Sequence, residues 1–344
     1  MGRVYDRGVG NLRTGIVLFC LAVPAFAEQI TLDVVVTSKS DKSHPVSGLQ
    51  QDDFTIVDNK VPEKIFSFKA VQGGASEPPV EVVLLIDRVN TAFGSSADVR
   101  GQVKKFLGTN EGKLNYPVSM VFFSDSGTET LNATRDANVL IEALDKSDAG
   151  LRSVNRSQGI YGAADRFQLS LRAVMGVAAL EEQKPGRKML IWISPGWPAL
   201  TSPRIQLTSK DKQQLFTGIV DASTALRKAR VTLYSIDPLG VSDAGGFRTT
   251  FYEGYLKGVK NFSQAQAENL SLQVLSSQSG GRVLNSGNDI AAQIAECVAD
   301  LSVYYVLTFD APRADAPNEY HALEVKIGKP GLMARTRTGY YDQP

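Results

Sequence analysis

Polar side chains directly follow two apolar runs of this 344-residue sequence. Residues 80–87 form a nearly continuous apolar run that ends in Asp87, and Thr91 lies just beyond it. Residues 188–194 form a second apolar run, which ends in Ser194. Carboxylate and hydroxyl oxygens are the ligands that a hard cation such as Mg²⁺ prefers. These strand-ending positions are therefore the first candidates for a site.

Acid–base and nucleophilic chemistry find little support in the sequence. The chain has two histidines, His44 and His321, and both lie far in sequence from the two apolar runs. A histidine-based triad is therefore not expected. The residues from Asp87 to Phe93 include no glycine, so a glycine-rich phosphate loop does not follow the first run. A Gly-x-Ser-x-Gly motif is absent as well, and we predict that the chain is not an enzyme.

The elements that position these residues follow from hydrophobic periodicity. Short apolar runs are typical of strands buried on both faces, and they alternate here with segments of helical period. The predicted strands are 80–87, 117–123, 188–194, 231–236 and 281–284, and the predicted helices are 96–108, 137–144, 160–182, 210–228, 263–278 and 288–301. This alternation predicts a doubly wound, mostly parallel α/β sheet over residues 80–302. Ligands bind such sheets at the carboxyl ends of the strands.

Both ends of the mature chain have β patterns instead. The predicted strands are 30–36, 53–59 and 65–68 near the start, and 304–310, 320–327 and 334–341 near the end. We expect the α/β domain to be inserted between residues 28–71 and 303–344, which together form a small β-sandwich. Two separate β modules are the alternative. Residues 72–79, rich in glycine and proline, are interpreted as a linker.

The first 27 residues have the order of a secretory signal peptide. Arginines at the start precede an apolar run over 15–23, and Ala25-Phe26-Ala27 matches a cleavage site. We expect an exported protein, periplasmic or secreted, whose mature chain begins at Glu28. A buried N-terminal helix is the alternative. The mature chain contains no apolar stretch of the roughly 20 residues that a transmembrane segment needs.

Charge and cysteine content exclude some partners. The chain has 37 basic and 36 acidic residues, so it lacks the electrostatic footprint of a protein that binds nucleic acid or an anionic membrane. Cys297 is the one cysteine outside the predicted signal peptide, which rules out an internal disulfide in the mature chain. Its apolar surroundings predict a buried side chain.

Several segments resemble the VWFA-related family of exported bacterial proteins, which contain a von Willebrand factor A-like (VWA-like) domain. The resemblance covers nearly the whole mature chain and is carried by the set of segments rather than by one of them. The segments are 46–59 (Val-Ser-Gly-Leu to Val-Asp-Asn), 84–91 (Leu-Leu-Ile-Asp-Arg-Val-Asn-Thr), 185–198 (Pro-Gly-Arg-Lys to Pro-Gly-Trp-Pro), 233–240, 279–282, 304–307 and 337–341.

The resemblance implies a metal-ion-dependent adhesion site, but this sequence departs from its pattern. The family places Asp-x-Ser-x-Ser after the first strand, a Thr in a second loop and an Asp after a later strand. Val89 stands at the first Ser position, and Pro195 replaces the later Asp. Too few oxygen ligands remain for useful Mg²⁺ affinity, so we expect no metal or other cofactor. The vestigial positions are Asp87, Thr91, Gln158 and Ser194.

The predicted function is that of a non-catalytic binding module. A partner protein would dock on the loops at the strand ends, with Trp197 as an aromatic anchor. The predicted contact residues are Asn90, Thr91, Phe93, Gln158, Ser194 and Trp197. The alternative is a structural or assembly protein of the cell envelope that acts through the edges of its β-sandwich, and a weaker alternative is a hydrolase. The loop over 238–258, rich in glycine and aromatic residues, is either functional or mobile.

Overall fold

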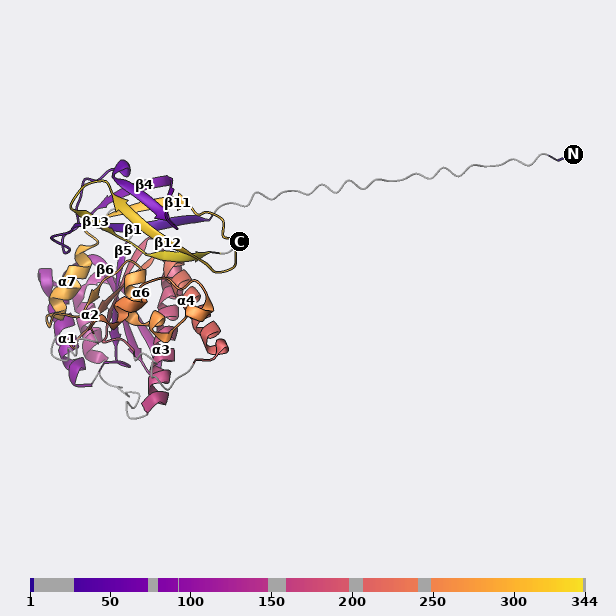
Figure 1. Cartoon of the computed structure of the whole chain (residues 1–344). Helices are drawn as coiled ribbons and strands as arrows, with labels where there is room; N and C mark the ends of the chain where they lie inside the picture. The colour runs from indigo at the N-terminus through magenta and orange to yellow at the C-terminus, as the bar shows by residue number, and fades with distance from the viewer. Residues whose placement is uncertain are drawn as a thin grey trace.

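The computed structural model places a β-sandwich against one end of an α/β domain (Figure 1). It describes residues 1–2, 28–73, 80–91, 93–147, 159–197, 207–240 and 249–342. The predicted signal peptide, most of the predicted linker, Gln158 and much of the 238–258 loop therefore lie outside the described residues. Within the described part, no helix has the length and apolar character needed to cross a membrane.

The α/β domain is built on one six-stranded sheet, and its predicted mostly parallel character is confirmed. Its strands lie in the order β10 (Val283–Leu284), β9 (Val231–Ile236), β8 (Arg187–Ile193), β5 (Val80–Asp87), β6 (Lys113–Ser124) and β7 (Gly127–Asp136). All neighbours are parallel except β6 and β7. The chain order reverses between β5 and β8, so the ends of these two strands form the switch point of the sheet.

Helices cover both faces of this sheet, and each face has its own apolar core. On one face lie α1 (Phe93–Leu107), α2 (Ala137–Lys146) and α7 (Ile290–Ala299). The short η2 turn (Thr109–Gly112) follows α1 and leads into β6. On the other lie α3 (Gly159–Glu182), α4 (Ser209–Lys228) and α6 (Leu272–Gln278).

The helix predicted over 263–278 is wrong in its first half. That stretch forms two 3₁₀ turns, η5 (Phe262–Gln264) and η6 (Ala267–Leu270), after a third one, η4 (Phe251–Tyr255). The hydroxyl of Ser271 accepts a hydrogen bond from the backbone N–H of Val274, which caps α6 and makes it begin at Leu272.

The sandwich is formed by strands from both ends of the chain. One sheet has the order β13 (Leu332–Arg335), β1 (Gln29–Ser38), β11 (Val303–Asp310) and β4 (Ile65–Gln72). The other has β14 (Gly339–Asp342), β12 (Glu319–Ile327), β2 (Phe54–Asp58) and β3 (Val61–Glu63), with the η1 turn (Gln51–Asp53) before β2. All pairings are antiparallel. The strand predicted over 334–341 is two strands, because the chain passes there from one sheet to the other.

The sandwich lies at the amino ends of the parallel strands. The chain enters β5 from β4 and leaves α7 for β11 on this side. Arg187, the first residue of β8, donates to the carbonyl of Asp300, and Arg230, just before β9, pairs with Asp33 of β1. The carboxyl ends of the strands, where Asp87 lies, are therefore at the far side of the sheet from the sandwich (Figure 1).

Candidate functional site

Asp87 is the centre of a buried polar cluster at the switch point of the sheet. It is the last residue of β5 and is 2% exposed. Its Oδ1 accepts the backbone N–H groups of Val89 and Asn90 at 2.9 and 2.8 Å. Its Oδ2 accepts Asn90 Nδ2 at 2.8 Å and Trp192 Nε1 at 3.0 Å. Four N–H donors thus occupy the four acceptor positions that a carboxylate offers.

This arrangement does not fit the magnesium site of the family that the sequence resembles. A cation would need lone pairs on Asp87 that already accept hydrogen bonds. Val89 is buried and provides no oxygen, and Pro195 provides no carboxylate. The hydroxyl oxygen of Thr91 is buried and has no hydrogen-bond partner among the residues described. Within the same residues, no three His, Cys, Asp or Glu side chains come together as metal ligands.

The other predicted contact residues are buried where the structure describes them. Asn90 is 4% exposed, and its Nδ2 also donates to Ser170 Oγ at 2.9 Å. Ser194 is fully buried, and its hydroxyl accepts the backbone N–H of Gly196 at 3.0 Å. These side chains hold the strand ends together. Gln158 lies outside the described residues, and Phe93 is placed only as the first residue of α1.

Trp197 is not the exposed anchor that the sequence predicted. Its side chain is 5% exposed, and its Nε1 donates a 3.0 Å hydrogen bond to the carbonyl of Leu270. Its ring lies edge-on to that of Trp192, with centroids 5.5 Å apart. An indole that is buried and hydrogen-bonded contributes to the core of its own domain. Thr91, which the sequence also predicted as a contact residue, is buried as well, at 6% exposure. Direct contact with a partner would need these side chains at the surface.

The structure places His321 in a buried polar cluster inside the sandwich. Its Nδ1 lies 3.1 Å from both carboxylate oxygens of Asp58, and the Tyr340 hydroxyl donates to Asp58 Oδ2 at 2.7 Å. The hydrogen bond with Asp58 raises the pKa of His321 above its ordinary value, against the opposing effect of burial. His321 Nε2 has no hydrogen-bond partner among the described residues. His44 is exposed beside Asp41.

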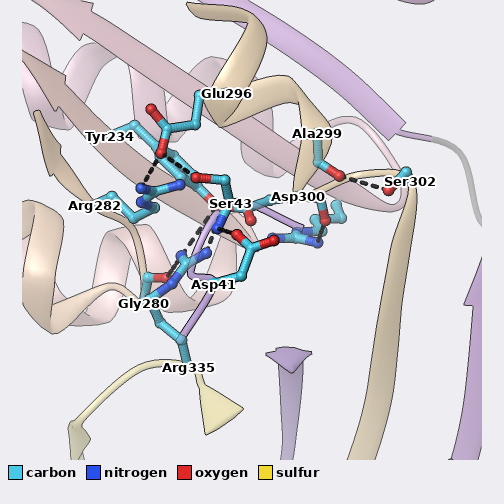
Figure 2. Close-up of polar contacts among 11 residues, drawn as sticks. Asp41, Ser43, Tyr234, Gly280, Arg282, Glu296, Ala299, Asp300, Ser302 and Arg335 are labelled. Atoms are coloured by element: carbon cyan, nitrogen blue, oxygen red, sulfur yellow. Dashed lines mark hydrogen bonds and ion pairs between the residues drawn. The ribbon is translucent and has the colours of Figure 1, made fainter. Parts of the chain in front are cut away.

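A buried ion pair fixes the sandwich on the α/β domain (Figure 2). Arg335 of β13 donates to the carbonyl of Gly280 at 2.6 Å and pairs with the fully buried carboxylate of Asp300. The Tyr234 hydroxyl of β9 donates to the same carboxylate at 2.8 Å. Beside this network, Glu296 of α7 accepts hydrogen bonds from the Ser43 hydroxyl and the Arg282 guanidinium. These contacts join one edge of the sandwich to the α/β domain.

The two edges of the sandwich differ in their surroundings. At the β13 and β14 edge, Tyr341 donates to the carbonyl of Val259 at 2.9 Å and its ring lies 6.0 Å from that of Phe216. At the opposite edge, β3 and β4 each pair with one neighbour in the part of the chain that the structure describes. Two large apolar side chains are exposed there, Val61 by 57% and Phe66 by 66%.

A β-bulge turns Phe66 outward. Ser67 pairs with Thr308, but Ile65 pairs with Phe309, so Phe66 is the extra residue on β4. Phe68, two residues on, packs in the sandwich core beside Tyr305, with ring centroids 6.0 Å apart. In a regular strand both phenylalanines would share one face. Regular pairing would thus turn both side chains toward the sandwich core, and the bulge is what leaves Phe66 at the surface.

Comparisons with known proteins find likeness in three dimensions only. No protein-family model matches the chain, and no curated sequence matches it. The pilus adhesin SpaC from Lactobacillus rhamnosus GG superposes with a TM-score of 0.40 at 11% identity, over 88% of this chain and 49% of that one. The PilB minor pilin from Streptococcus sanguinis gives 0.38 at 11% identity, over 66% and 61%. Manganese-loaded TRAP protein from Plasmodium vivax gives 0.38 at 10%, over 79% and 96%.

This chain thus spans about half the length of the pilus adhesin and less than two thirds of the minor pilin. At these TM-scores and identities the likeness carries no functional argument.

Proposed function

We propose that this chain is an exported, non-catalytic binding and assembly protein of the bacterial cell envelope, which joins a partner protein at the open β3 and β4 edge of its sandwich. Its α/β domain is proposed to be a VWA-like scaffold with a degenerate adhesion site that holds no metal. The observation that carries the proposal is the contrast between the two sandwich edges: one is fixed on the α/β domain, and the other exposes Phe66 and Val61.

An open edge with apolar side chains suits protein binding. Edge strands have unpaired backbone N–H and C=O groups that an extended segment of a partner can use. Burying an exposed phenylalanine in an interface contributes about 1.5–3 kcal/mol, and aromatic residues are common anchors of interfaces. The bulge at Phe66 and the exposed Lys69 on β4 oppose indiscriminate pairing between copies of the chain. For the polar cluster around Asp87 we propose a structural role and not partner binding, because every acceptor position of the Asp87 carboxylate already receives a hydrogen bond from within the protein.

The proposal is tested by capture of partners from a native envelope fraction with the mature chain as bait. Phe66→Ser should lose the partner that the unchanged chain retains. Val139→Ser is the matched control, because Val139 is exposed by 45% on α2 of the α/β domain and is not part of the β3 and β4 edge. Tyr161→Ser tests the strand-end loops, since Tyr161 is exposed by 79% near the start of α3. Loss of the partner with Tyr161→Ser and not with Phe66→Ser would overturn the edge assignment in favour of the strand ends.

Export is proposed on the predicted cleavage after Ala27. Support comes from Glu28, whose carbonyl accepts the backbone N–H of Ala311 at 2.8 Å and whose carboxylate pairs with Arg227 at 2.6 Å. A chain that begins at Glu28 therefore keeps the contacts of the sandwich. Mass spectrometry of the N-terminus of the native protein should find Glu28 first. Met1 or Gly2 at the terminus of the main species would contradict the proposal.

A further inference from the structure

A groove runs along the junction of the two domains, away from the β4 edge. Two adjoining depressions of about 840 and 500 Å³ share Lys60, Lys260, Tyr320 and Ala322 in their walls. One wall is the β2–β3 turn and the outer face of β12, and the other is the segment 254–269 of the α/β domain. The groove therefore exists only when both domains are in place.

The walls of the groove are fixed by close packing. A Cβ atom on Gly258 would lie 1.9 Å from Cζ of Tyr320, so only glycine allows the segment to approach β12 this closely. Tyr341 packs on Tyr320 from another direction, with ring centroids 5.2 Å apart, and holds the carbonyl of Val259. The ring of Tyr320 thus packs against both Gly258 and Tyr341, which leaves it half-buried.

Positive charge dominates the lining. Lys60, Lys257 and Lys260 are exposed, and none of them has an ion pair with a residue that the structure describes. Glu319 is the one carboxylate among the described lining residues, and its Oε2 accepts the backbone N–H of Asp315 at 2.6 Å. Three ammonium groups thus face a groove that contains one carboxylate. Clefts lined by one sign of charge concentrate ligands of the opposite sign.

Lys60 lies in this lining with a backbone conformation that is unfavourable for a lysine. Asn59 and Lys60 have φ values of 46° and 74°, the left-handed conformation of a two-residue hairpin turn. Asparagine tolerates this conformation, whereas the second position favours glycine. A strained residue that persists beside a cleft points to a role other than folding.

We propose that this groove binds an acidic peptide segment, with the ammonium groups of Lys60, Lys257 and Lys260 paired to its carboxylates. Charge complementarity argues for an anionic ligand. A peptide is favoured over an acidic saccharide because the two aromatic side chains of the described lining, Tyr255 and Tyr320, are both half-buried, and Tyr320 packs against Gly258 and Tyr341. The groove adjoins the β3 and β4 edge at Lys60, which directly precedes Val61 of β3, but no residue of β4 lines it, so Phe66 separates the two proposals and they can fail independently.

The test measures fluorescence anisotropy of the mature chain with a labelled peptide of about twelve residues, alternating Glu and Ser, in low-salt buffer. The triple variant K60E/K257E/K260E should weaken binding by about tenfold or more. The control K39E/K42E/K113E makes the same change in net charge at exposed lysines outside the groove and should bind like the unchanged chain. Equal affinity of the two triple variants, or equal binding of a Gln–Ser peptide, would overturn the proposal.

Two further measurements guard against misfolding and against a different ligand. In the unchanged chain, the peptide should protect Lys60, Lys257 and Lys260 from acetylation and leave Lys39 and Lys42 reactive. Lys60→Gly should raise the melting temperature, because it relieves the positive φ, while it weakens binding several-fold.

Unprotected groove lysines, or an unchanged affinity of Lys60→Gly, would contradict the proposal. Tighter binding of oligogalacturonate through the same lysines would overturn it in favour of an acidic saccharide. Phe66→Ser should leave peptide binding unchanged.

Discussion

The indole of Trp192 donates its N–H to the carboxylate of Asp87 across 3.0 Å, and this bond ties the end of β8 to the end of β5. Both residues are buried, at 0% and 2% exposure. The bond lies at the switch point, the place where a doubly wound sheet usually binds its ligand. Here the carboxylate of Asp87, which the sequence suggests as a ligand, accepts hydrogen bonds from within the protein.

Replacing Asp87 by Ala should strongly destabilise the fold. The change leaves two backbone N–H groups, the Asn90 amide and the Trp192 indole without the acceptor that they share. Each buried donor left unsatisfied costs about 1–3 kcal/mol, and we expect a total loss of about 3–5 kcal/mol. Urea unfolding measures it. Asp98→Ala, at an exposed position of α1, is the control and should change stability by less than about 0.5 kcal/mol.

Metal ions should leave the stability of the protein unchanged. Each lone pair of Asp87 already accepts a hydrogen bond, and Val89 and Pro195 supply no replacement ligand. A ligand that binds only the native state raises its stability with concentration, so absence of binding means coincident melting curves. Thermal melts with EDTA and with millimolar Mg²⁺ or Mn²⁺ should overlay. A rise of several degrees that Asp87→Ala abolishes would show that a metal site exists after all.

The central strands of the sheet could be predicted because a strand that is buried on both faces needs a nearly continuous run of apolar residues. The apolar run 231–236 has the same bounds as β9, and that at 188–194 differs from β8 by one residue at each end. β7 was not predicted, because it is an antiparallel edge strand whose side chains are mostly exposed or half-buried. Its sequence, Gly-Thr-Glu-Thr-Leu-Asn-Ala-Thr-Arg-Asp, lacks the apolar run or alternation that the prediction depends on.

The position of the candidate site could be predicted from the sequence, but the role of its residues could not. The rule that strand ends carry ligands identified Asp87, yet the donors to its carboxylate include Trp192, which is 105 residues away. The sequence predicts an exposed Trp197, because this residue follows a strand and lies between two prolines. Its hydrogen-bond partner, the carbonyl of Leu270, is 73 residues further along the chain. Contacts across such distances depend on how helices and turns pack. Periodicity within a segment contains no information about them.

Removing Arg335 should destabilise the junction of the two domains. Arg335→Met leaves the buried carboxylate of Asp300 with only the Tyr234 hydroxyl and no cation, and breaking a buried ion pair in this way costs about 3–5 kcal/mol. Thermal or urea unfolding followed by near-ultraviolet circular dichroism measures the loss. Lys329→Met is the matched control, because Lys329 and Asp53 form a pair on the sandwich surface that is worth about 1 kcal/mol or less. Equal effects of the two changes would contradict a structural role for the Arg335 pair.

The buried pair of His321 and Asp58 should make stability depend on pH near neutrality. The hydrogen bond with Asp58 raises the pKa of His321 in the folded protein above the unfolded value of about 6.5. A raised folded pKa means that protonation favours the folded state. The stabilising contribution is therefore complete below pH of about 6.5 and is lost as the pH rises through the folded pKa.

His321→Gln isolates this contribution from other titrating groups. The difference in unfolding free energy between the unchanged chain and His321→Gln should be largest in mildly acidic buffer and should decrease as the pH is raised through the folded pKa of His321. His44→Gln is the control, because it removes the other histidine of the chain, which lies at the surface beside Asp41. The chain has two histidines, so two-dimensional NMR can follow each imidazole separately. A His321 titration at or below the ordinary value, or a difference that grows with pH, would show that Asp58 does not stabilise the imidazolium.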